Sequence, residues 1–218
     1  MKNKTICFIG LDGSGKSTSV DYAYDTLKAS GIKVKKVRAA YVIKFMSFFI
    51  KLGKKLVLKK DSDPYTADYK TYLENMRKQS EKKGIYRIFS LMTTFEFKCQ
   101  IFFSITMNRL FGYTLLVDRY IYDNAVTYAA NLGKDTEFLR ETIEKKWKHA
   151  PKPDLIIYIK TDVDTCLSRK DDIPDPLYLN IREPLYDEVA HLYNATIISG
   201  ANDKETMLRE VVDAINSI

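Results

Sequence analysis

The sequence predicts an α/β fold in which a mostly parallel sheet is covered by helices on both faces. Short apolar runs, typical of buried strands, alternate along the chain with longer segments whose apolar residues recur at helical spacing. Parallel strands need long crossover connections, which the helical segments supply. With 218 residues, 45% of them hydrophobic, the chain is long enough to bury one substantial core. We therefore expect a single domain over 1–218.

Five short apolar runs are the expected strands. The first, 4–9, contains a continuous Ile-Cys-Phe-Ile run that predicts a buried strand. The second, 32–37, partly alternates apolar residues with lysines. The other three lie at 115–117, 155–159 and 196–198.

Helical patterns fill the intervals between these runs. Apolar residues at i, i+3, i+4 and i+7 over 20–27 predict a helix with one apolar face, and Gly31 follows its end. The longest helical pattern covers 85–106. The last helix closes the chain, and Asn202 and Glu205 have the spacing of a capping box at its start.

Composition excludes several classes of protein. Nine glycines, six prolines and three cysteines do not fit a collagen-like fibre or a disulfide scaffold, and the apolar content is too high for a disordered chain. Cys7, Cys99 and Cys166 lie in apolar surroundings without metal-ligand spacing, so we expect core thiols. Neither a signal-peptide pattern nor an apolar run of about 18 residues is present, which predicts a cytoplasmic protein.

The strongest motif follows the first expected strand directly. The run GLDGSGKS at 10–17 satisfies G-x-x-x-x-G-K-[ST] and stands between a strand and a helix. Its glycines let successive main-chain N–H groups point at phosphate oxygens, and the helix N-terminus adds its positive end. Lys16 is expected to reach the β and γ phosphates of ATP, and Ser17 to bind Mg²⁺. The residues expected to hold the nucleotide are Gly10, Asp12, Gly13, Ser14, Gly15, Lys16, Ser17 and Thr18.

A second motif ends the strand at 115–117. Asp118, Arg119 and Tyr120 follow this apolar run, where the carboxyl edge of a parallel sheet gathers its ligands. Asp118 is suited to hold Mg²⁺, directly or through water. Arg119 offers a planar fork for phosphate oxygens.

Taken in chain order, these motifs resemble the thymidylate kinase family. The resemblance is carried by 10–18, by the Asp-Arg-Tyr triplet, and by the segments 155–169 and 197–201. It implies a three-layer P-loop fold with a five-stranded parallel sheet, and transfer of a phosphoryl group from ATP–Mg to a nucleoside monophosphate. It also implies that a homodimer can form, because related kinases are often dimers.

The same resemblance implies roles for individual residues. Asp12 stands where family members contact the acceptor near its sugar and phosphate. Arg119 is expected to bind the acceptor phosphate, next to Tyr120, and Arg38 can meet the same group. These residues are the expected acceptor site.

Family members also carry a mobile lid whose arginines stabilise the transferring phosphoryl group. The equivalent segment here is about 164–184, and Arg169 and Arg182 are the candidates for catalytic charge. Arg169 has an alternative role, stacking on the adenine of ATP.

The acceptor is left open because several family positions differ. Residues 37–41 replace an Arg-Glu-Pro-Gly type run, and 94–98 lacks the arginine that helps to read thymine. The customary serines and Tyr-Gln pair are replaced by Asp123-Asn124 and Thr127-Tyr128. A nucleoside monophosphate such as dTMP is the first hypothesis. A sugar- or lipid-linked phosphate is the second, and an ATP-binding switch without catalysis is the third.

The positive charge is a local feature. Residues 26–60 hold eleven Lys or Arg and no acid, within a chain of net charge +7. Over 41–58 a lysine stripe accompanies a broad apolar surface, which fits either a core-facing helix or a basic amphipathic helix. The second interpretation places 41–60 on an anionic membrane or beside an amphiphilic acceptor. No recognised nucleic-acid motif accompanies the charge, so nucleic acid is not an expected partner.

Overall fold

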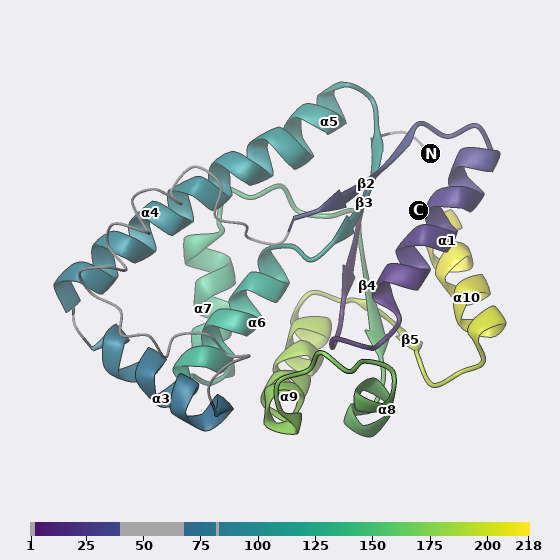
Figure 1. Cartoon of the computed structure of the whole chain (residues 1–218). Helices are drawn as coiled ribbons and strands as arrows, with labels where there is room; N and C mark the ends of the chain where they lie inside the picture. The colour runs from purple at the N-terminus through teal and green to yellow at the C-terminus, as the bar shows by residue number, and fades with distance from the viewer. Residues whose placement is uncertain (1–2, 40–67, 82) are drawn as a thin grey trace.

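The computed structural model describes residues 3–39, 68–81 and 83–218 (Figure 1). In this part of the chain a parallel sheet has the strand order β2-β3-β1-β4-β5. The prediction of a five-stranded parallel α/β sheet is confirmed. The strands are β1 (Thr5–Ile9), β2 (Val34–Arg38), β3 (Thr114–Asp118), β4 (Leu155–Lys160) and β5 (Thr196–Ser199).

The central position of β1 explains its continuous apolar sequence. Each of its residues is buried, because β3 and β4 flank it and helices cover both faces. Cys7 is level with Val117 of β3 and Ile156 of β4 in the parallel register. The carboxyl ends of the three strands consequently meet at one edge of the sheet, where the glycine-rich loop begins.

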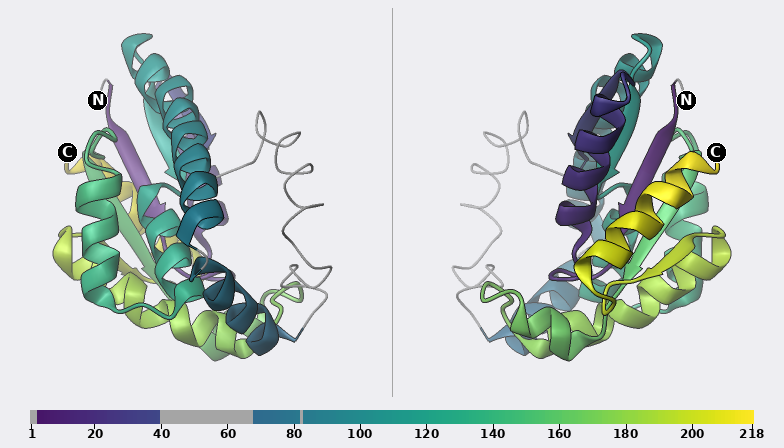
Figure 2. Two further views of the ribbon diagram at one scale, coloured as in Figure 1. Left: turned by 90° about the vertical axis from the view of Figure 1, so that its left-hand side faces the viewer. Right: turned by 90° about the vertical axis from the view of Figure 1, so that its right-hand side faces the viewer.

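Helices form a layer on each side of the sheet, as predicted, and the two views of Figure 2 each face one of these layers. One layer contains α1 and α10, which lie side by side. The other contains α4, α6, α7 and α9 among its members. The α-helices are α1 (Lys16–Ala29), α3 (Tyr69–Ser80), α4 (Lys83–Ile101), α5 (Met107–Leu110), α6 (Ile121–Leu132), α7 (Thr136–Glu141), α8 (Val163–Ser168), α9 (Pro176–Leu192) and α10 (Lys204–Asn216), and two π-helical turns are η1 (Phe102–Thr106) and η2 (Thr142–Lys146).

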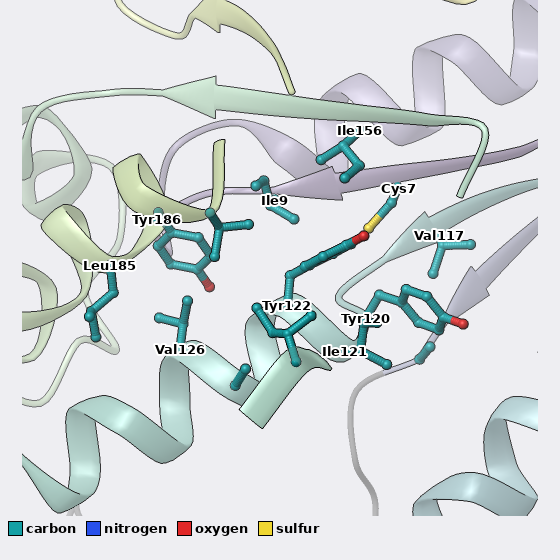
Figure 3. Close-up of a cluster of buried hydrophobic side chains, with 14 of the residues drawn as sticks. Cys7, Ile9, Val117, Tyr120, Ile121, Tyr122, Val126, Ile156, Leu185 and Tyr186 are labelled. Carbon is teal, nitrogen blue, oxygen red and sulfur yellow. The ribbon is translucent and has the colours of Figure 1, made fainter. Parts of the chain in front are cut away.

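Each face of the sheet has its own apolar core. Ile6 and Phe8 of β1 pack towards α1 and α10, whereas Cys7 and Ile9 pack towards the other layer. Alternation along a strand sends successive side chains to opposite faces, so one apolar run supplies both cores. Figure 3 shows part of the second core, in which Cys7 lies close to Tyr122.

A buried carboxylate fixes the start of α6 within this second core. Asp123 accepts a hydrogen bond of 2.9 Å from the main-chain N–H of Tyr120 and one of 2.8 Å from the hydroxyl of Tyr186 on α9. Burial raises the pKa of this carboxyl group. The bonds anchor the first turn of α6 to α9, directly behind the Asp-Arg-Tyr motif.

The structure differs from the expected helices in two details. The pattern at 85–106 is not one uniform α-helix, because it passes from α4 into the π-helical turn η1. The cap of α10 is Asp203, whose carboxylate accepts from the N–H of Thr206 at 3.0 Å, and not Asn202. The two candidate caps are adjacent, and spacing alone did not separate them.

The structure also bears on the expected lid segment, the amphipathic segment, the cysteines and the absence of a membrane-spanning helix. The lid segment 164–184 covers most of α8 and the first half of α9. The amphipathic segment 41–58 lies outside the described residues. The three cysteines are free thiols, with Cys7 and Cys166 buried and Cys99 half-buried. In the described ranges, no helix is both long and apolar enough to span a bilayer.

Candidate active site

The glycine-rich loop connects β1 to α1 in a conformation that requires glycine. Gly13 has a φ of +88°, and a Cβ there would lie 2.5 Å from the carbonyl oxygen of Cys166 in α8. Gly10 is equally restricted, with a φ of +141° and a Cβ position 2.5 Å from the carbonyl oxygen of Ile159. Side chains at these positions would clash with main-chain atoms, so the loop can pack this closely only with glycine.

Lys16 begins α1 and is buried beneath this loop. Its ammonium group donates to the carbonyl oxygens of Gly10 at 2.8 Å and Leu11 at 2.5 Å. Burial, followed by the charge of Arg119, lowers the pKa of Lys16. A cation held in this way is well placed to be stabilised by an incoming anion.

A cavity of about 600 Å³ opens over the loop, at the carboxyl edge of the sheet. Among the described residues that line it, six carry a positive side chain and two a carboxylate, so the cavity favours a polyanion. The basic residues come from five different places in the chain, and the fold brings them together. The lining residues are Asp12, Gly13, Gly15, Lys16, Ser17, Thr18, Arg38, Asp118, Arg119, Arg169, Lys170, Gly200, Asn202, Lys204 and Met207.

Asp12 connects the loop to two other elements. One carboxylate oxygen forms an ion pair with Arg119, and the other accepts a hydrogen bond of 2.9 Å from the hydroxyl of Tyr178 on α9. Burial opposes ionisation of Asp12, but Arg119, Lys16 and Tyr178 together hold its pKa below the ordinary value. Burial likewise disfavours the charge of Arg119, yet Asp12 raises the pKa of the guanidinium. The pair is therefore charged at neutral pH.

Arg119 occupies an unusual backbone conformation. Its φ is +64°, in the left-handed region that residues other than glycine seldom adopt. Such a conformation costs roughly 1–3 kcal/mol and persists where the surroundings enforce it. Here the ion pair with Asp12 and the anchored start of α6 hold the side chain over the cavity.

Ser17 and Asp118 fit the requirements of a magnesium ion. Both line the cavity, and both offer the hard oxygen ligands that Mg²⁺ prefers. Oδ1 of Asp118 is buried and has no hydrogen-bond partner among the described residues. A buried carboxylate oxygen without a partner is costly unless a cation or water contacts it.

The lid segment contributes to the cavity from the end of α8. The guanidinium of Arg169 donates to the carbonyl oxygen of Gly200 at 3.0 Å, next to the loop. Lys170 lines the cavity beside it. Arg38, at the end of β2, is level with Asp118 in the sheet register and is exposed at the cavity margin.

Four expected site residues do not line this cavity: Gly10 and Ser14 of the glycine-rich loop, Tyr120 and Arg182. The Ser14 side chain is fully buried within the loop. The hydroxyl of Tyr120 donates to the carbonyl oxygen of Pro151 at 2.8 Å, and the ring is buried in the core, as Figure 3 shows. Arg182 is only 3% exposed. It donates to the hydroxyl of Tyr69 at 2.8 Å and to Oδ1 of Asn131 at 3.0 Å, and it stacks on the ring of Tyr178. In this arrangement Arg182 orders the elements around Tyr178.

A second cavity, of about 180 Å³, lies between α4, α6 and η2, with α3 at its margin. Its lining mixes hydroxyls and amides with aromatic rings. A chain of contacts joins it to the first cavity, from Asn131 through Arg182 and Tyr178 to Asp12. Its lining residues are Met76, Ser90, Thr93, Thr94, Phe97, Asn124, Thr127, Tyr128, Asn131, Lys146 and Trp147.

Several residues at or beside the cavities were not predicted as site residues. Tyr178, which contacts Asp12, and the lining residues Asn202 and Lys204 belong to no nucleotide-binding motif. Their positions depend on how α9 and the β5–α10 loop pack against the glycine-rich loop. Lys146 was one of many charged residues on a helical segment. Only the fold shows that it faces a cavity.

No protein-family model matches the chain. A curated protein of Archaeoglobus fulgidus named "Probable thymidylate kinase" is 26% identical over 160 residues, which cover 73% of this chain. The matched region spans 65% of that relative's length. The chain is thus similar to a protein described as a kinase of a nucleotide, in agreement with a cavity suited to phosphate groups.

Proposed function

We propose that this protein is a nucleotide kinase that transfers the γ-phosphoryl group of ATP to the phosphate of a nucleoside monophosphate, with dTMP or a related nucleotide as the acceptor. One observation carries the proposal. A glycine-rich loop with a buried lysine and a strand-end Asp-Arg pair share one cavity, in which basic lining residues outnumber acidic ones by six to two. The similarity to a probable thymidylate kinase supports the same conclusion.

The donor occupies the loop in this proposal. The first turn of α1 leaves main-chain N–H groups without helical partners, and Ser17 and Thr18 of that turn line the cavity. Lys16 exchanges its carbonyl partners for phosphate oxygens, and Arg169 and Lys170 approach from α8. Magnesium bound by Ser17 and Asp118 would neutralise part of the charge on the β and γ phosphates.

In the proposal, the acceptor phosphate binds in the larger cavity beside Arg119 and Arg38. Asp12 and Tyr178 fix the guanidinium of Arg119, so the acceptor oxygen is positioned before the reaction begins. That oxygen forms a bond to the γ phosphorus while the bond from the γ phosphorus to the bridging oxygen of ADP breaks. The acceptor oxygen is already ionised, so no general base is required.

Coupled assays of ADP release test the proposal. Purified protein with ATP and Mg²⁺ is expected to release ADP only when a nucleoside monophosphate is present, and a panel of monophosphates identifies the preferred one. Calorimetry measures ATP binding in parallel. ATP binding without ADP release above background for every monophosphate would contradict the proposal and favour an ATP-binding switch.

A further inference from the structure

The second cavity has the position expected for the part of the acceptor that is remote from its phosphate. Helix α6 begins at Ile121, two residues after Arg119, and carries Asn124, Thr127 and Asn131 along the cavity wall. One helix thus leads from the proposed phosphate site to the second cavity. The contacts from Asn131 to Asp12 described above join the same two places.

Some polar groups of this cavity can act only as hydrogen-bond acceptors towards a ligand, and one can act only as a donor. The hydroxyl protons of Thr93 and Thr94 are both donated to the carbonyl oxygen of Ser90, at 3.1 and 2.6 Å. These two oxygens therefore face a ligand as acceptors. Asn124 and Thr127 can donate or accept. Lys146 is different, because an ammonium group can only donate.

Lys146 lacks a polar partner among the described residues. Its Nζ lies 4.4 Å from the ring centroid of Tyr128 and 5.4 Å from that of Trp147, and no hydrogen bond or ion pair with a described residue is formed. None of the described lining residues is an Asp or Glu. Burial, with a further effect of Lys98, lowers the pKa of Lys146 to about 8. A ligand oxygen that accepts from Nζ would relieve both the desolvation and the missing bond.

We propose that Lys146 determines acceptor specificity by donating to a keto oxygen on the ring of a nucleoside monophosphate, and thereby discriminates against a ring with an amino group at the same position. The inference rests on the proposed function and names its substrate class. A keto oxygen satisfies the ammonium group, whereas an amino group presents a second donor and leaves both donors unsatisfied. Hydrogen bonds to charged groups contribute enough for about tenfold discrimination.

Trp147 provides a readout that does not depend on catalysis. It is the single tryptophan of the chain, and it lines the second cavity next to Lys146. Its fluorescence is therefore expected to change when this cavity is filled. Titrations without ATP compare dUMP and dCMP, which share sugar and phosphate and differ in the keto or amino group. The wild type is expected to bind dUMP about tenfold more tightly.

Three variants test the role of Lys146. Lys146→Met keeps the length of the side chain and removes the donor, so the dissociation constants for dUMP and dCMP should converge to within about twofold. Lys146→Arg restores a donor and should retain the preference. Lys145→Met is the matched control, because Lys145 is exposed and pairs with Glu141 on the helix surface. Thermal unfolding confirms that each variant is folded.

The results separate this inference from the proposed function. An unchanged preference in Lys146→Met, equal binding of dUMP and dCMP to the wild type, or no response of Trp147 to either nucleotide overturns the role of Lys146. Failure of the proposed function has a different signature. The nucleotides then bind with the expected preference, and no ADP is released when ATP and Mg²⁺ are added.

Discussion

The two cavities found among the described residues are built in different ways. In the larger one, main-chain conformation sets the floor, because the loop from β1 to α1 is continuous in sequence and a Cβ at Gly10 or Gly13 would lie 2.5 Å from a carbonyl oxygen. Side chains from other parts of the chain complete its walls. The smaller one is formed by side chains of α3, α4, α6 and η2, which are far apart in the sequence. A site shaped by main-chain conformation tolerates few substitutions, whereas a site formed by side chains can be altered by substituting one residue at a time. If the proposed function holds, single substitutions should seldom change which donor is bound, whereas they can change which acceptor is preferred.

Removal of Lys16 should produce the largest effect. Lys16→Ala deletes the buried ammonium group of the larger cavity, and we expect phosphoryl transfer to fall at least about 100-fold, as for the loss of a preorganised charge-stabilising donor. Turnover under saturating substrates measures this. Circular dichroism should show an unchanged fold. Retained turnover would mean that the larger cavity does not hold the transferring group.

Arg119 tests the proposed acceptor side of the larger cavity. Arg119→Ala removes the guanidinium beside Asp12, and the KM for the monophosphate should rise about 10- to 100-fold, while the KM for ATP changes far less. Steady-state kinetics with each substrate varied in turn provides the test. Equal increases for both substrates would show that Arg119 does not belong to the acceptor side.

The main-chain construction of the larger cavity can be tested with a pair of glycines. Gly31→Ala places a Cβ in open space at a φ of +75°, and its cost should be about 1 kcal/mol. Gly13→Ala adds the clash with the Cys166 carbonyl, so the free energy of unfolding should fall by about 1–3 kcal/mol more. Urea unfolding compares the two variants. Equal losses would show that the approach to α8 is not tight.

The smallest expected effect concerns the hydroxyl of Tyr178. Tyr178→Phe removes its hydrogen bond to Asp12, and we expect a loss of about 1 kcal/mol in unfolding free energy at neutral pH. Tyr193→Phe is the control, because the Tyr193 hydroxyl is buried without a hydrogen-bond partner among the described residues. It should cost almost nothing.

The stability difference between the wild type and Tyr178→Phe should also depend on pH, in a direction that follows from the pKa of Asp12. Asp12 has a lowered pKa in the folded protein, so its stabilising effect is complete above the ordinary value of 3.8 and is lost as the pH falls through the folded value. The difference between wild type and Tyr178→Phe should therefore shrink in acid. A difference that stays constant as the pH falls from 7 through the titration of Asp12 in the folded protein would show that the bond does not act on the ionised form of Asp12.

The sequence was informative wherever local chemistry determines structure. The apolar run of β1 and the glycine-rich loop were apparent because burial and main-chain conformation constrain adjacent residues. The same reasoning could not place Tyr178 or Lys146, since both depend on how distant helices pack. It also gave Arg182 a catalytic role from its place in the lid segment, whereas the structure shows it buried between Tyr69 and Asn131.

The contact between Gly13 and α8 has a consequence for comparisons among relatives. The atom that Gly13 approaches is the carbonyl oxygen of Cys166, which every amino acid possesses. Substitution at 166 can therefore leave the contact intact, and the two positions need not vary together over evolutionary time. Methods that infer proximity from correlated changes would overlook this junction, although it ties the loop to a helix some 150 residues away.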